Sequence, residues 1–173
     1  MAEVKFKTPL GNFQESGVYG GHIKVPLDLA KKVMAKDKRV VCTLNDQISI
    51  HAGLISDGKG GFFININKEL SKKLQAFEGD ELEVHLEEDI SKYGMAIPEG
   101  FEELLEQDPN AERYFHGLTK GKQRSLLHII NKPKNVQLKL EKAFIILDYL
   151  KDVRGNLDFK EVNEALKNNR FKR

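Results

Sequence analysis

The chain has 173 residues, of which 40% are hydrophobic and 31% are charged. This composition is typical of a globular protein and too apolar for a disordered one. A single cysteine, Cys42, excludes an intrachain disulfide and a zinc site built from several thiolates. The net charge is +2, but residues 1–93 carry 13 basic against 14 acidic residues, whereas residues 119–173 carry 14 against 6.

Length and hydropathy give a first outline. No window approaches the roughly 18 consecutive apolar residues of a membrane-spanning helix. Because residues 1–11 are charged and lack an apolar run, no signal peptide is predicted and a cytoplasmic location is expected. We predict a β-rich domain over residues 1–90, a linker over 91–97 and a helical region with a basic tail over 98–173.

The first half of the sequence contains an internal repeat. Residues 23–44 align with residues 64–86 at an offset of 41, with five identical positions, among them Ile23 with Ile64. Each copy is predicted to form a short strand, a helix of about two turns with one apolar face, and a second strand. The shared order of elements favours a true repeat over a chance match between two lysine-rich windows.

The strands around the repeat show the alternation of half-buried β-structure. In the closing strand, Leu82, Val84 and Leu86 face one way and the intervening acidic residues and His85 face the other. With an N-terminal strand at Val4–Thr8 and a linking hairpin, the two copies predict a small closed barrel with pseudo-twofold symmetry, because closure leaves no free strand edge. The predicted class is α+β.

Three separated motifs in this half carry a resemblance. Gly20–Pro26, Phe62–Lys68 and Glu78–Val84 resemble, in order, the bacterial domain of unknown function numbered nineteen-oh-five, over roughly Val4–Asp89. The resemblance implies a double-split β-barrel, similar to that of the AbrB and MazE transition-state regulators. In those proteins two chains each supply a strand–helix–strand half, whereas the repeat suggests that this chain carries both halves.

The second half has helical patterns. Thr119 is predicted to cap one helix and Asp158 another, because their side chains can accept from unpaired backbone N–H groups. Lys132–Pro133 ends the first of these helices, since proline disfavours helical geometry in the residue before it. The predicted helices are Lys120–Asn131, residues 136–152 and Phe159–Lys167.

Ile97 to about Asp152 resembles the family described as bacteriocin-protection, YdeI or OmpD-associated. The resemblance rests on a proline-led helix at Ile97-Pro98-Glu99, an Asp108-Pro109 stop and the helices that follow. Where the family has a Thr-Arg pair, this sequence has Asn135-Val136, with Lys139 as the next basic residue. No function attached to that pair is therefore carried over.

Motifs for catalysis are missing from the sequence. Cys42 alternates with apolar residues and is expected to be a buried small hydrophobe. His51 and His85 fall on polar strand faces, where solvated side chains are expected. His22 follows two glycines, so a pocket could form there; the candidate pocket residues are Gly20, Gly21, His22, Phe62 and Phe63. No catalytic residue, metal site or cofactor is predicted.

The basic C-terminal third is a candidate surface for anions or nucleic acid, although lysine-rich helix faces are also common for solubility alone. Its candidate residues are Lys120, Lys122, Arg124, Lys132, Lys134 and Lys139.

Three hypotheses for function follow. The first is a non-enzymatic bacterial binding protein for a peptide, envelope component or small ligand, linked to antimicrobial or envelope stress protection. The second is a nucleic-acid-binding protein with an AbrB-like barrel and basic helices. The third is an enzyme with a pocket near His22. A monomer or weak dimer is expected.

Overall fold

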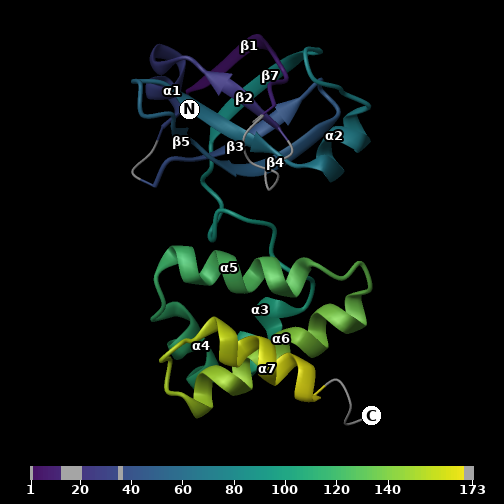
Figure 1. Ribbon diagram of the computed structural model, residues 1–173. Helices are drawn as coiled ribbons and strands as arrows, with labels where there is room; N and C mark the ends of the chain where they lie inside the picture. Colours follow the sequence, from purple (N-terminus) through teal and green to yellow (C-terminus); the bar gives the residue numbers. More distant parts are fainter. Residues whose placement is uncertain (1, 13–20, 35–36, 170–173) are drawn as a thin grey trace. The chain divides into compact units, whose positions relative to one another are not determined.

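The computed structural model describes residues 2–12, 21–34 and 37–169, and it divides into two compact units. Unit 1 spans residues 1–94 and unit 2 spans residues 95–173. The described strands lie in unit 1, and unit 2 is helical (Figure 1). The predicted α+β class is confirmed.

Unit 1 contains two antiparallel sheets. One has the strand order β1-β7-β3-β4 and the other β2-β6-β5. The strands are β1 (Glu3–Pro9), β2 (Gly21–Val25), β3 (Arg39–Leu44), β4 (Ile48–Gly53), β5 (Ile55–Ser56), β6 (Phe62–Ile66) and β7 (Glu81–Glu88).

Alternation along the strands places the core of unit 1. In β7, Leu82, Val84 and Leu86 are buried, as the sequence pattern predicted. They belong to one apolar cluster that also includes Cys42 of β3 and Ile64 of β6, so both sheets contribute to a single core. Successive side chains of a strand point to opposite faces, and the other face of the four-stranded sheet is therefore free to carry polar groups.

The two segments predicted as a repeat form the same order of elements. They are β2, α1 (Leu27–Val33) and β3 in one segment, and β6, α2 (Lys68–Leu74) and β7 in the other. β2 pairs with β6, and β3 pairs with β7, with Cys42 opposite Leu86 and Leu44 opposite Val84. The repeat aligns Cys42 with Val84 and Leu44 with Leu86. Replacing each residue of one pair by its aligned counterpart therefore gives the other pair. The strands form two separate sheets, so duplication and barrel closure stay predictions.

The end of α2 is held by a tight turn against the end of β1. Asn67 caps the start of α2, its Oδ1 accepting from the Leu70 N–H at 2.8 Å. After the helix, Gly79 adopts a φ of 90°, which favours glycine, and its N–H donates to the carbonyl oxygen of Leu10 at 2.8 Å. This contact brings the chain after β1 alongside the C-terminal end of α2.

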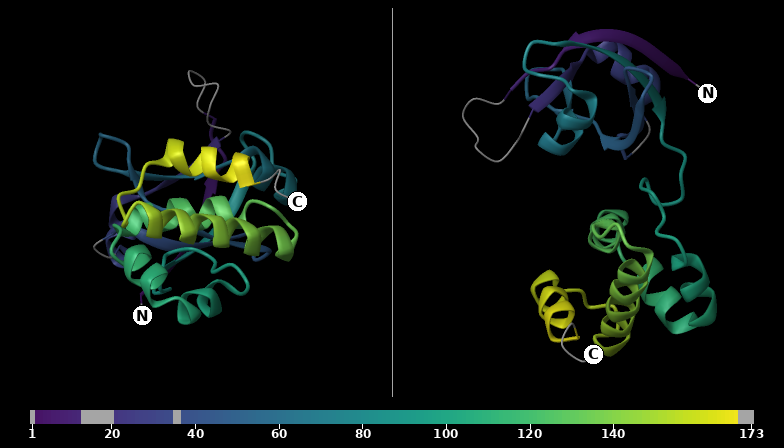
Figure 2. Two further views of the ribbon diagram at one scale, coloured as in Figure 1. Left: turned by 90° about the horizontal axis from the view of Figure 1, so that it is seen from below. Right: turned by 90° about the vertical axis from the view of Figure 1, so that its right-hand side faces the viewer.

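Helix α6 is the centre of unit 2 and contacts the other four helices (Figure 2). The buried rings of Phe101 and Phe115 meet edge to face, with centroids 5.1 Å apart. None of the described helices combines the length and the apolar character needed to cross a bilayer. The helices are α3 (Phe101–Gln107), α4 (Pro109–His116), α5 (Lys120–Asn131), α6 (Val136–Asp152) and α7 (Phe159–Asn169).

Asp108 both ends α3 and begins α4, so the predicted stop at Asp108-Pro109 is also a start. Its N–H donates to the Leu105 carbonyl at 3.2 Å, and its Oδ1 accepts from the Ala111 N–H at 3.1 Å. Pro109 occupies the first turn of α4, where its missing N–H costs nothing. Lys151 of α6 donates to the other carboxylate oxygen at 2.6 Å, so the backbone and side chain of this one residue join three helices.

Candidate functional site

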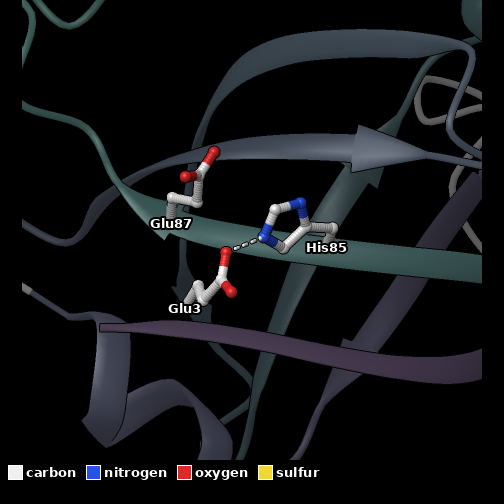
Figure 3. Close-up of side chains that lie close together, drawn as sticks. All are labelled: Glu3, His85 and Glu87. Atoms are coloured by element: carbon white, nitrogen blue, oxygen red, sulfur yellow. Dashed lines mark hydrogen bonds and ion pairs between the residues drawn. The ribbon is translucent and has the colours of Figure 1, made fainter. Parts of the chain in front are cut away.

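The outward face of the four-stranded sheet brings together Glu3 of β1 with His85 and Glu87 of β7. Glu3 lies directly opposite Glu87 in the register, and His85 lies two residues away on the same face. The Nε2 of His85 and the Oε2 of Glu3 are 2.8 Å apart (Figure 3). The ligand atoms of all three residues lie within 4.8 Å of one another. An imidazole and two carboxylates are donors that divalent transition metals accept.

The Glu87 carboxylate differs from its two neighbours. It is half-buried, yet it forms no hydrogen bond or ion pair with another residue that the structure describes. Like charges directly opposite each other on a sheet are destabilising. The cluster therefore contains a carboxylate whose charge has no counterpart.

A second histidine on this face also contacts a carboxylate. His51 Nδ1 lies 2.7 Å from Asp89 Oδ2, and the Asp89 side chain has no exposed surface. Burial acts to raise the pKa of Asp89, but hydrogen bonds from the Ser91 hydroxyl, His51 and the Ser91 N–H outweigh it and hold that pKa below its ordinary value. Among the described residues no serine, threonine or cysteine donates to His51, so the pair lacks the nucleophile of a catalytic triad.

His51 and His85 lie on the polar strand face, as expected, and each also contacts a carboxylate that the sequence did not indicate. Their carboxylate partners, Asp89 and Glu3, are 38 and 82 residues away in the chain. Sequence spacing carries no signal for such pairs, because they depend on which strands become neighbours.

The candidate pocket at His22 is only partly assembled. The His22 ring meets the Phe63 ring edge to face, with centroids 6.0 Å apart, and the His22 backbone pairs with Gly11. A Cβ at Gly11 would lie 2.7 Å from His22 Cε1, so the His22 ring would have to shift if Gly11 carried a side chain. Burial, and then the charge of Lys24, lower the pKa of His22 and favour the neutral imidazole.

The candidate residue Phe62 does not join His22 and Phe63. Phe62 alternates with Phe63 on β6, so its side chain turns into the core, where it is 9% exposed. Gly21 is buried against the Gly11 carbonyl. Gly20 lies outside the described residues.

A groove of about 680 Å³ lies beside α2, and Gly11 links it to His22. Its apolar wall consists of Leu10, Ala76 and Phe77, and the Phe77 side chain is 76% exposed. Lys68 and Lys72 of α2 also line the groove. We call this feature the α2 groove.

The six basic residues named from the sequence fall into separate groups. Lys120 and Lys122 are exposed in the first turn of α5, with Arg124 a few residues on. Lys132 and Lys134 follow the end of α5. The helix rise of about 1.5 Å per residue places Lys132 roughly 18 Å from Lys120. That distance exceeds the screening length of about 8 Å at physiological salt. Lys139 lies one turn into α6, closer to the second group.

Cys42 has the properties of a core residue. Its side chain is buried, and burial raises the pKa of the thiol to about 12. A thiol of this kind is a poor nucleophile at neutral pH, because the thiolate is the reactive species.

Comparison with known proteins assigns a family resemblance to each unit. Residues 6–86 match the family model of the domain of unknown function DUF1905, which lies within unit 1. Residues 95–151 match the family described as Bacteriocin-protection, YdeI or OmpD-Associated, which lies within unit 2. Both resemblances inferred from the sequence motifs are confirmed. No curated protein matches the chain.

Proposed function

We propose that this chain is a non-enzymatic bacterial binding protein whose α2 groove takes a short acidic peptide with apolar side chains. The observation that carries the proposal is the groove itself, about 680 Å³ with an apolar wall and two lysines. Ligand sites of proteins are typically concave, mostly apolar and about 300–1,000 Å³ in volume, with a few polar groups that orient the ligand.

The apolar wall supports binding of side chains such as leucine. Phe77 is 76% exposed, and its N–H is fixed by the Asp80 carboxylate at 2.8 Å. The hydrogen bond holds the backbone of Phe77, and a large exposed aromatic side chain is a typical anchor of a binding surface.

The charge of the groove supports an acidic ligand. Lys68 and Lys72 are four residues apart and share one side of α2. Neither forms an ion pair with a described residue, whereas Lys73 on the neighbouring side pairs with Glu69 at 3.5 Å. Among the described residues that line the groove, Lys68 and Lys72 outnumber the single acidic residue, Glu78.

A role in protection against antimicrobial peptides or envelope stress is part of this proposal. The match of unit 2 to a family whose description includes bacteriocin protection supports it. We place the protein in the cytoplasm. The inert thiol of Cys42 and the incomplete His51–Asp89 pair favour binding over catalysis.

The test is fluorescence anisotropy with a labelled Glu-Leu-Glu-Leu-Glu-Leu peptide and a matched Lys-Leu peptide. We expect the acidic peptide to bind and Lys72→Glu and Phe77→Ser to weaken it at least about tenfold, a change of 1.4 kcal/mol. Lys73→Glu is the control, because that lysine already has a partner. Equal binding of both peptides, or no effect of the groove variants, would contradict the proposal.

The nucleic-acid alternative is tested in the same experiment with a labelled random duplex. Binding that falls steeply with salt and weakens on Lys120→Glu or Lys132→Glu would favour it, because phosphate contacts release counterions.

We also propose that unit 1 is an AbrB-like double-split β-barrel made from an internal repeat. The exchange of pairs between Cys42–Leu86 and Leu44–Val84 supports it, since a twofold relation requires such an exchange. Because both halves are in one chain, the protein is expected to be monomeric, which sedimentation measures.

A further inference from the structure

We propose that Glu3, His85 and Glu87 bind a divalent transition-metal ion, for which Zn²⁺ is the probe. This inference concerns the outward face of the four-stranded sheet and is independent of the α2 groove. Failure of either proposal leaves the other standing.

The strands supply the geometry. His85 and Glu87 are two residues apart on β7 and therefore share a face, and Glu3 on β1 lies directly opposite Glu87. Their ligand atoms already lie within 4.8 Å of one another (Figure 3). Zinc bonds of about 2.0–2.2 Å place neighbouring ligand atoms roughly 3–4 Å apart. Small side-chain rotations are therefore enough to close the site.

The charges supply the reason for an ion. Two carboxylates face each other across β1 and β7, and the His85 imidazole hydrogen-bonds to the carboxylate of Glu3. Lys7 of β1 pairs with Glu83 of β7 at 3.6 Å. Lys5 forms no ion pair with a described residue. A dication between the carboxylates would neutralise both and give Glu87 the partner it lacks.

The ligand types select the metal class. One imidazole nitrogen favours zinc-like ions over calcium or magnesium, which prefer all-oxygen sites. Three protein ligands leave a coordination position for water, as in open zinc sites. Because Glu3 comes from β1 and the other two from β7, the ion would also cross-link two strands. Binding should therefore raise thermal stability, which is measured without any assay of activity.

The experiment uses the full chain without an affinity tag, stripped with EDTA and dialysed. Calorimetric titration and thermal unfolding are followed with ZnCl₂ for the wild type, Glu87→Gln and Glu83→Gln. Glu87→Gln keeps the shape of the side chain and removes a ligand charge. Glu83→Gln is the matched control, because it changes the same residue type on the same face of the same strand.

We expect one ion per chain and a rise in melting temperature for the wild type and Glu83→Gln. Glu87→Gln should bind at least about tenfold more weakly. Co²⁺ in place of Zn²⁺ should give visible absorption bands that Glu87→Gln loses. No heat and no thermal shift up to about 1 mM Zn²⁺, the weak end of specific affinity, would overturn the proposal. Equal affinity of the wild type and Glu87→Gln would overturn it too.

Discussion

Unit 1 and unit 2 hold their polar side chains in place by different means. In unit 1 the pair His85–Glu3 joins residues 82 positions apart, on strands that only the topology makes neighbours. In unit 2 most caps are local, as when the Thr119 hydroxyl accepts from the Lys122 N–H at 3.3 Å. A local cap such as Thr119 stabilises one helix, whereas cross-strand pairs depend on the whole sheet. A site that combines side chains from distant chain segments therefore forms more readily in unit 1.

The largest expected effect compares the two cores. Phe115→Ala in unit 2 should lower the free energy of unfolding by about 3–5 kcal/mol, and Leu86→Ala in unit 1 by about 2–5 kcal/mol, because both side chains are fully buried. Urea unfolding followed by circular dichroism measures both. Phe144→Ala is the control, since that ring is 58% exposed. A loss below about 1 kcal/mol in either core variant would contradict the assigned burial.

The next test asks how closed the core of unit 1 is. Burial raises the pKa of the Cys42 thiol from 9.0 to about 12, so the thiolate fraction at pH 8 falls about a thousandfold. A thiol-reactive dye should therefore label the folded chain at least about a thousandfold more slowly than the urea-unfolded chain. Since Cys42 is the only cysteine, the signal has one source. Comparable rates would show that the core opens readily.

The third prediction concerns the buried carboxylate of unit 1. The pKa of Asp89 in the folded chain lies below its ordinary 3.8, so its charge stabilises the fold above about pH 4, and this contribution is lost as pH falls through the lowered value. Asp89→Asn should lower the free energy of unfolding by about 1–3 kcal/mol at pH 7. It should also make that free energy fall less steeply as the pH is lowered. Thermal unfolding between about pH 2 and 7 measures this. Glu88→Gln is the control, because Glu88 is the exposed neighbour. The same loss of stability at acidic pH in the wild type and Asp89→Asn would refute the assignment.

The smallest expected effects compare one cap from each unit. Asn67→Ala in unit 1 and Thr119→Ala in unit 2 should each cost about 1 kcal/mol. The hydrogen bond of Asn67 is shorter, 2.8 Å against 3.3 Å, so its loss should cost more. Chemical denaturation measures the difference, and a larger loss for Thr119→Ala would reverse the order.

The sequence predicted the local features of both units well. Thr119 caps α5, which covers the predicted residues 120–131, and Asp158 accepts from the Lys160 N–H at the start of α7, at 2.8 Å. The alternation in β7 also gave the correct buried face. Each of these features depends on residues within a few positions of one another, where propensity and hydrogen-bonding chemistry act directly.

The candidate sites were harder to predict because they depend on strand order. Nothing in the pattern around His85 indicates that Glu3 becomes its neighbour, and the same holds for His51 and Asp89. The six basic residues were proposed to line one surface, although the predicted bounds of α5 already placed Lys120 and Lys132 roughly 18 Å apart. Phe62 and Phe63 were grouped by adjacency, although adjacent strand residues point apart.

The corner at Asp108 also affects the unfolded chain. Helices α3 and α4 are separated by this one residue, and Pro109, which follows it, has a restricted φ even when the chain is unfolded. Folding this corner therefore removes less backbone freedom than ordering a longer, unrestricted loop would. Part of the stability of unit 2 thus comes from the lower conformational entropy of its unfolded chain. No contact in the folded structure accounts for this part.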